Sequence, residues 1–333
     1  MTQRDTRFQS STITFVLLLA AVAAACTPDH RPSIQISPAP PETTTTTGEL
    51  EGGGSDATVH AASMGHPLPL FWADSPSLIE RSASPPSNAA LAAIVMDEAS
   101  GTILYEKDAH RQLQPASLTK IATAILAAEN GRLDEPFTID VDSRTMRGST
   151  VMGLISGDHF TMRDLLHGLM MPSGNDAALA IGRAVAGSDA AFVQQMNDLS
   201  RRLGLTDTNW ANPHGLNGLD HRTSAYDLAI LSRYYMSFPD LRDVVSKPSY
   251  TARGDRAIQM WTLNPLFGYP GVDGLKTGYT RSAGNTLVTS RVMDGHRIFV
   301  VILNDGNRAG DAWALAQWAN VAYRWPDSAA APR

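Results

Sequence analysis

The chain has 333 residues, of which 43% are hydrophobic and 18% are charged, and its formal net charge is −6. These proportions are ordinary for a soluble globular protein of one or two domains. An acidic chain without a basic run argues against nucleic acid as a partner. Cys26 is the only cysteine, so the chain has no internal disulfide and no cysteine-rich metal site. No histidine spacing matches a metal motif, and we expect neither a metal nor another cofactor.

Residues 1–26 have the pattern of an export signal. Arg4 and Arg7 precede the run ITFVLLLAAVAAAC, residues 13–26, which is shorter than the roughly 20 apolar residues of a membrane-spanning helix. A basic head, a short apolar run and small residues predict a secretory signal peptide. An uncleaved anchor is the weaker alternative. We therefore expect the mature protein outside the cytoplasm, in the periplasm or the extracellular space.

Cys26 stands at the end of this run, where it resembles the lipidated cysteine of bacterial lipoprotein signals. Such signals usually carry leucine three residues earlier, whereas this chain has Ala23. The alternative is simple cleavage after the alanines that precede Cys26, which would leave the cysteine unmodified. We favour lipidation of Cys26, which would anchor the protein to the membrane through its N-terminus.

Residues 27–87 are rich in Pro, Thr, Ser, Gly and Ala, as in PAPPETTTTTGELEGGGSD. They offer few large apolar side chains for a core, so we predict a disordered linker. Residues 88–325 carry regular strand and helix patterns and are expected to form one domain. The last residues, 326–333, are expected to be a disordered tail.

The domain opens with two strand-like runs and a helix. Residues 89–97 and 101–107 have a hairpin pattern with Gly101 in the turn. Apolar residues at helical spacing follow over 116–130, so Ser117 should lie in the first turn of a mostly buried helix. The segment 132–240 is mostly helical, with helices expected over 161–171, 175–187, 190–204 and 224–237.

The last part of the domain returns to strands, over residues 271–280, 284–294 and 296–304, and closes with a helix over 310–325. The order is strand pair, helix, helical insert, strands and helix. This order predicts the α+β class, with an antiparallel five-stranded sheet flanked by the first and last helices and an all-helical lobe inserted between strands.

Three short motifs stand in this framework. SLTK is Ser117–Lys120 at a helix start, SGN is Ser173–Asn175 on a loop between two helices, and KTG is Lys276–Gly278 on a strand. Each motif alone is a weak signal, because short patterns of common residues arise by chance. The three together, each in the element that its chemistry needs, indicate acyl transfer by a serine nucleophile.

The spacing of the first motif has a chemical reason. A serine hydroxyl is a poor nucleophile until a base takes its proton, and Lys120 lies on the same helix face as Ser117. A free lysine has a pKa of about 10.4 and is charged at neutral pH. Burial and a second cation, for which Lys276 is the candidate, would lower the pKa of Lys120 and make it a base.

The other motif residues fit the remaining steps of acyl transfer. The backbone amides of Ser117 and Tyr279 could form an oxyanion hole, whose individual donors are typically worth about 2.7–4 kcal/mol. Ser173 can pass a proton to a leaving amine, and Asn175 can hold a peptide group of the substrate. Thr277 offers a hydroxyl to a substrate carboxylate.

The chain from about residue 88 to 325 resembles the low-molecular-mass penicillin-binding proteins of the D-alanyl-D-alanine carboxypeptidase family, serine peptidase family S11. The resemblance rests on PASLTKIATA, MPSGNDAALAIG, NPHGL and DGLKTGYTRSAGNTLV, which stand in family order. It implies the DD-peptidase and β-lactamase type of fold. It also implies removal of the terminal D-alanine from peptidoglycan stem pentapeptides, a role in cell-wall biosynthesis, and inhibition by β-lactams.

The resemblance assigns roles to residues of all three motifs. It implies that Ser117 is the acylated nucleophile and Lys120 the general base, with Ser173 and Asn175 as the second motif. The third motif, Lys276, Thr277 and Gly278, completes the set. The family also grips the substrate's terminal carboxylate with a late arginine, and Arg308 in NDGNRAGD matches that place. The alternative for Arg308 is a solvated loop residue.

Four functions remain to be weighed. A DD-carboxypeptidase is favoured, and a DD-endopeptidase of cross-linked peptidoglycan shares the same motifs. A β-lactamase is disfavoured, because class A enzymes deacylate with a glutamate between the second and third motifs and the last glutamate here is Glu135. A catalytically inactive binding module is disfavoured because every motif residue is present. His214 in NPHGL has no evident chemical role, and we expect its imidazole to bond to backbone.

Overall fold

The computed structural model describes residues 74–79, 84–216 and 218–326. The predicted signal peptide, Cys26, most of the predicted linker and the tail from residue 327 lie outside the described residues. Among the described helices, none combines the length and the apolar character that a membrane span requires.

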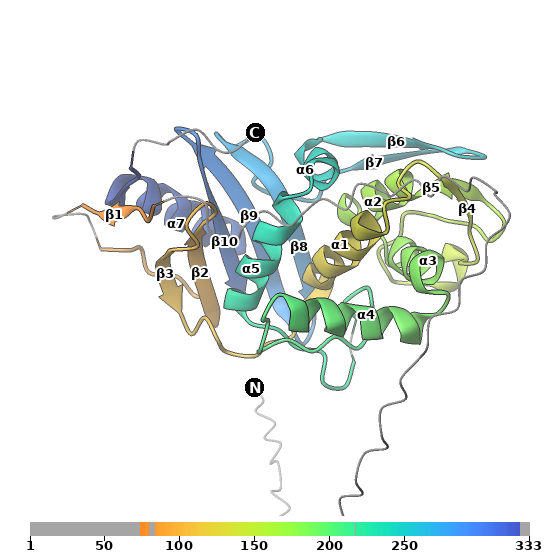
Figure 1. Ribbon diagram of the computed structural model, residues 1–333, viewed down its shortest axis with the longest axis horizontal. Coiled ribbons are helices and arrows are strands. Elements are labelled where there is room, and N and C mark those ends of the chain that lie inside the picture. The colour runs from red at the N-terminus through yellow and green to blue at the C-terminus, as the bar shows by residue number, and fades with distance from the viewer. Residues whose placement is uncertain (1–73, 80–83, 217, 327–333) are drawn as a thin grey trace, which may run out of the picture. The chain divides into compact units, whose positions relative to one another are not determined.

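A five-stranded antiparallel sheet organises the domain (Figure 1). Its strands run in the order β3-β2-β10-β9-β8, so β8 is an edge strand. The expected hairpin of the first two strands and the expected three strands near the end are confirmed. The strands are β2 (Ala92–Asp97), β3 (Ile103–Lys107), β8 (Val272–Thr280), β9 (Gly284–Met293) and β10 (His296–Leu303).

The two faces of the sheet are apolar and each is covered by a helix, because side chains alternate along a strand. Val300 and Ile302 of β10 pack in one core with α7 (Arg308–Ala322). Phe299 and Val301 belong to the second core, which the other helices share. Figure 1 shows α7 and α5 (Ala225–Met236) on opposite sides of the sheet.

The prediction that the first helix flanks the sheet needs correction, whereas the prediction for the last helix is confirmed. Helix α5 contacts β2 and β10, and the first helix, α1 (Lys120–Asn130), packs against α5. All residues of α5 except Tyr226 are buried, and a helix that is buried all round needs partners on both sides. Helix α5 therefore lies between the sheet and α1.

The helical lobe gathers around α1, and local signals mark several of its helix ends. Thr161 caps α2 (Met162–Met170) in a capping box with Asp164, and Gly187 ends α3 (Asn175–Ala186) in the left-handed conformation. Ser188 caps α4 (Asp189–Arg202). These helices were expected from the sequence.

Several short elements were not expected. The lobe also holds a strand pair, β4 (Pro136–Thr138) with β5 (His159–Thr161), so it is not entirely helical. Helix α6 (Pro239–Ser246) and the hairpin of β6 (Ser249–Arg253) and β7 (Ala257–Trp261) precede β8. A short 3-10 turn, η2 (Ser143–Thr145), follows β4.

The first described residues lie beside the last ones. Strand β1 (Ser77–Leu78) pairs antiparallel with β11 (Tyr323–Arg324), directly after α7. The sequence assigned residues 77 and 78 to the linker and residues 323 and 324 to the last helix, and the structure gives each segment a two-residue strand. The boundaries at 87 and 325 remain predictions.

Candidate active site

Ser117 lies in a 3-10 turn, η1 (Ala116–Thr119), that leads directly into α1. The sequence predicted the first turn of the helix, and the turn differs from that only in its tighter winding. Ala116 has a φ of +51°, which is uncommon for a residue with a side chain. Ser117 is partly exposed, whereas Ala116, Leu118 and Thr119 are buried. The start of the helix is therefore buried, and Ser117 is the residue of the turn that solvent can reach.

The amine of Lys120 has three oxygen neighbours. Its Nζ lies 3.1 Å from Ser117 Oγ, 2.6 Å from Asn175 Oδ1 and 2.8 Å from the His214 carbonyl oxygen. A neutral amine has two N–H bonds and one lone pair. Donation to Asn175 and His214 would leave the lone pair for the proton of the Ser117 hydroxyl. The three neighbours therefore suit an uncharged amine that acts as a base.

Burial favours the uncharged forms of both lysines. Lys120 is 0% exposed, and desolvation, assisted by the positive charge of Lys276, lowers its pKa well below 10.5. The Asp176 carboxylate opposes this effect. Lys276 is 1% exposed, and burial together with the charge of Arg308 lowers its pKa to about 7. The positive charge of Lys276 thus acts on the Lys120 amine in the direction that the sequence analysis expected.

The second motif approaches Lys120 from the start of α3. Asn175, the first residue of α3, also donates through Nδ2 to Ser149 Oγ. Ser173 has a φ of +63° and is 4% exposed. Its hydroxyl has no hydrogen-bond partner within the described part of the chain. The described contacts do not join Ser173 to Ser117 or to Lys120.

Asp176, which the sequence analysis missed, fixes the loop behind the second motif. Its carboxylate accepts the backbone N–H groups of Met152, Gly153 and Leu154 at 2.7, 2.8 and 2.9 Å. The same loop contributes Thr150, whose hydroxyl donates to the Ser173 carbonyl at 2.8 Å. An aspartate in the first turn of a predicted helix was the available signal, because anions are favoured there.

The third motif lies on β8 and touches the nucleophile turn. A Cβ atom on Gly278 would lie 3.0 Å from the Ser117 amide nitrogen and 2.4 Å from Thr286 Oγ1. Only glycine therefore lets β8 approach Ser117 this closely. Thr277 is 7% exposed and Tyr279 is 65% exposed. The backbone of Tyr279 continues this strand beside the turn.

Arg308 is the first residue of α7 and lies against β8. Its Nη1 donates to the carbonyl oxygens of Gly278 at 2.5 Å and Thr286 at 3.1 Å, and the side chain is partly buried. The sequence placed Arg308 before the helix, and the alternative of a solvated loop residue does not agree with these contacts. Its role toward a carboxylate remains a prediction.

His214 contributes to the site through its backbone. Its carbonyl accepts from Lys120, which the sequence analysis did not foresee. Its ring nitrogen Nδ1 accepts the Leu216 N–H at 3.1 Å, so the expected bond between imidazole and backbone is confirmed. Asn212 holds the same loop by accepting the N–H groups of His214 and Gly215.

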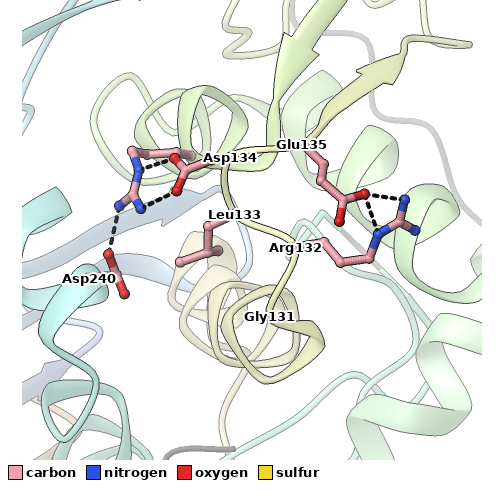
Figure 2. Close-up of a pocket in the computed structure, with 7 residues that line it drawn as sticks. Gly131, Arg132, Leu133, Asp134, Glu135 and Asp240 are labelled. Carbon is pink, nitrogen blue, oxygen red and sulfur yellow. Dashed lines mark hydrogen bonds and ion pairs between the residues drawn. The ribbon is translucent and has the colours of Figure 1, made fainter. Parts of the chain in front are cut away.

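A surface pocket lies at the opposite end of α1 from Ser117, around Gly131 (Figure 2). Its charged side chains are already paired with one another: Arg163 binds Asp134 and Asp240, and Arg132 binds Glu135. No motif residue lines this pocket. The chemistry that the sequence predicts is therefore at the Ser117 end of α1.

Comparison with known proteins identifies the family of this chain. The family model for D-alanyl-D-alanine carboxypeptidase matches residues 79–307. The chain therefore belongs to the D-alanyl-D-alanine carboxypeptidase family.

Curated relatives agree with this assignment. D-alanyl-D-alanine carboxypeptidase DacD of Escherichia coli K12 is 35% identical over 257 residues, which are 71% of this chain and 64% of the relative. DacF of Bacillus subtilis 168 is 32% identical over 221 residues, which are 64% of this chain and 57% of the relative. The chain thus spans less than two thirds of the length of these two relatives.

Solved structures of related proteins share the fold. Penicillin binding protein 6B from Escherichia coli has a TM-score of 0.67 and 34% identity, covering 72% of this chain and 80% of that one. The Streptomyces K15 DD-transpeptidase has a TM-score of 0.68 and 28% identity, covering 72% of this chain and 99% of that one. The α+β fold predicted from the sequence is therefore confirmed.

Proposed function

We propose that the chain is a serine-type D-alanyl-D-alanine carboxypeptidase. It removes the terminal D-alanine from peptidoglycan stem pentapeptides through an acyl-enzyme on Ser117. The observation that carries the proposal is the buried Lys120 amine, 3.1 Å from Ser117 Oγ and bonded to two further acceptors. The family and the names of the relatives supply the substrate class.

The acylation step follows from this arrangement. The uncharged Nζ of Lys120 takes the proton of Ser117 as Oγ attacks the carbonyl carbon between the two D-alanines. The oxygen of the tetrahedral intermediate gains negative charge and accepts the N–H groups of Ser117 and Tyr279. The C–N bond then breaks. Ser173 gives its hydroxyl proton to the leaving amine and regains one from Lys120, so D-alanine departs as a neutral amine.

The remaining motif residues orient the substrate. The side-chain amide of Asn175 holds a peptide group of the stem peptide. The hydroxyl of Thr277 and the guanidinium of Arg308 receive the terminal carboxylate, and the positive charge of Lys276 attracts it. Gly278 lets β8 lie close to the Ser117 amide, so that the strand and the nucleophile face the same substrate.

The acyl-enzyme distinguishes the candidate functions. Water hydrolyses the peptide ester and frees Ser117, whereas a β-lactam forms an ester that persists, so the protein binds penicillin. The absence of any glutamate after Glu135 disfavours rapid β-lactam hydrolysis. A DD-endopeptidase would use the same residues on a cross-link, and it is the alternative that the experiment below addresses.

Labelling and product analysis test the proposal together. Wild-type protein should bind fluorescent penicillin covalently at Ser117, found by peptide mass spectrometry, and should lose the label slowly. Ser117→Ala should neither label nor release D-alanine from a pentapeptide. Release of D-alanine without cleavage of cross-linked dimers supports a carboxypeptidase. Cleavage of dimers alone would support the endopeptidase, and loss of the label within seconds would support a β-lactamase.

We also propose that the protein is exported and then anchored through lipidated Cys26, with the segment between Cys26 and β1 as the tether. The export pattern of residues 1–26 and the cell-wall substrate support this location. Mass spectrometry of the mature N-terminus should find a diacylglyceryl group on Cys26, and Cys26→Ser should release the protein from the membrane fraction. An unmodified cysteine would show simple cleavage instead.

A further inference from the structure

A chain of hydrogen bonds runs from a buried histidine to the peptide bond that precedes Ser117. His221 and Thr119 are 3% and 0% exposed. His221 Nε2 lies 2.8 Å from Thr119 Oγ1, which lies 2.8 Å from the carbonyl oxygen of Ala116. Neither His221 nor Thr119 is among the residues proposed above to contact substrate.

The direction of each bond in this chain is fixed. The Ala211 N–H donates to His221 Nδ1 at 2.8 Å, so Nδ1 is an acceptor. The proton of the neutral ring is then on Nε2, which donates to Thr119 Oγ1. The single hydroxyl proton of Thr119 goes to the Ala116 carbonyl. Burial lowers the pKa of His221 to about 4 and so keeps the ring neutral.

The peptide group at the end of this chain is the one that the proposed reaction uses. It joins the Ala116 carbonyl to the Ser117 amide, and a peptide group is planar. Whatever fixes the carbonyl oxygen therefore also fixes the direction of the Ser117 N–H. Ala116 adopts its positive φ there, a conformation that persists only when its surroundings hold it.

Gly215 encloses the same carbonyl from the loop that carries His214. A Cβ atom on Gly215 would lie 1.8 Å from the Ala116 oxygen, so the backbone of this loop is in close contact with the turn. His221 ends the same loop, because it bonds back to Ala211 at its beginning. The loop therefore supplies the His214 carbonyl to Lys120 at one point and fixes the Ala116 carbonyl at another.

We propose that His221 is a positioning residue for acylation. Acting through Thr119, its neutral imidazole holds the Ala116–Ser117 peptide so that the Ser117 N–H points at the oxyanion and Oγ points at Lys120. The inference rests on the proposed acyl-enzyme at Ser117. It assigns to His221 an effect on the rate of the acylation step and none on non-covalent binding.

Two pairs of variants test this chain of hydrogen bonds. His221→Ala and Thr119→Val each break it, whereas His221→Gln and Thr119→Ser keep a donor and an acceptor in place. Stopped-flow measurements with a fluorescent penicillin separate the non-covalent Kd from the acylation rate constant. His167→Ala is the matched control, because His167 is also buried, but its Nδ1 bonds to the Arg163 carbonyl and not to Thr119. Thermal unfolding is recorded for every variant.

We expect the two breaking variants to acylate roughly 10- to 100-fold more slowly, because small displacements of reacting groups have effects of this size. The Kd should not change, and His221→Gln and Thr119→Ser should recover most of the rate. Wild-type rates in both breaking variants would overturn the inference. So would an equal loss of rate in His167→Ala, which would indicate general destabilisation. Failure of the wild-type protein to label at Ser117 would instead refute the proposed function.

Discussion

Lys120 and Lys276 are both buried, but the surroundings of their amines differ. Lys120 Nζ has three oxygen neighbours, whereas Lys276 Nζ donates to the Thr277 carbonyl at 3.0 Å. Burial lowers the pKa of Lys276 to about 7, and the charge of Arg308 contributes. Lys276 therefore changes its charge near neutral pH. When its positive charge is lost, the electrostatic effect that favours an uncharged Lys120 is lost as well.

We expect acylation by penicillin to slow as the pH rises through about 7. Lys276 then loses the positive charge that attracts the carboxylate and lowers the pKa of Lys120. In Arg308→Gln the alkaline decline should move to higher pH, because removal of a neighbouring positive charge raises the pKa of Lys276. The second-order rate constant for labelling, followed from neutral to alkaline pH, checks both statements. Coincident profiles for the wild type and the variant would contradict them.

At the scale of elements, the site forms where η1, strand β8 and the loop after α4 meet. Glycines allow both close approaches: Gly278 of β8 faces the Ser117 amide, and Gly215 of the loop faces the Ala116 carbonyl. Sheet and lobe reach the same turn from different sides, because η1 contacts β8 and β9 while leading into α1. A displacement of either element would move Ser117 relative to Lys120.

Gly215→Ala should therefore slow acylation by at least roughly tenfold and destabilise the fold. Its Cβ would lie 1.8 Å from the Ala116 oxygen, and its φ is +88°. Gly187→Ala is the matched control, since its φ is +77° and nothing lies within 4 Å. The control should be destabilised only by the strain of an alanine in the left-handed conformation, about 1–2 kcal/mol. It should keep the wild-type acylation rate. Equal acylation rates in the two variants would show that the loop contact is not needed.

The elements predicted from the sequence are segments in which apolar residues recur at a clear period over many residues. The five sheet strands and the helices α1 to α5 and α7 carry such patterns. Helix α6, with 8 residues, and strands β6 and β7, with 5 each, were not predicted, because such short segments hold few repeats of any period. The sequence predicted that α1 covers the sheet, whereas α5 does. Periodicity shows that α5 is apolar, but it does not show which elements pack against it.

The motif residues could be named because their chemistry restricts residue type and spacing. The contacts of Asp176, His221 and the His214 carbonyl could not be predicted, because these groups act on backbone groups or across long separations in the chain. Thr119 and His221, for example, are 102 residues apart. Such partners become visible only when the fold brings the segments together.

At the scale of the whole molecule, acid should weaken the fold through buried neutral histidines. His167 and His221 are 0% and 3% exposed, and burial lowers the pKa of each from 6.5 to about 4. Their contribution to stability is complete above the unfolded pKa of 6.5. It is lost as the pH falls toward about 4, because the unfolded chain binds protons that the folded chain excludes. Each histidine contributes up to about 1.4 kcal/mol per pH unit in this window.

We expect the unfolding free energy of His167→Gln to depend less on pH than that of the wild type. The difference in slope should approach about 1.4 kcal/mol per pH unit between the two pKa values. Urea unfolding at a series of pH values measures it. The comparison with the variant is needed because carboxyls whose pKa is raised by partial or full burial, such as Glu98 and Asp227, act in the opposite direction. Parallel curves would mean that His167 titrates normally in the folded protein.

The most direct test of the account is the titration of Lys120 itself. Lysines labelled with ¹³C at Cε report amine protonation by NMR, and the signal missing from Lys120→Arg identifies Lys120. We predict a midpoint well below 10.5, and a rise of that midpoint in Lys276→Gln, since removing the second cation favours protonation. A midpoint at or above 10.5 would mean a charged ammonium beside Ser117, and the mechanism proposed for this chain would be wrong.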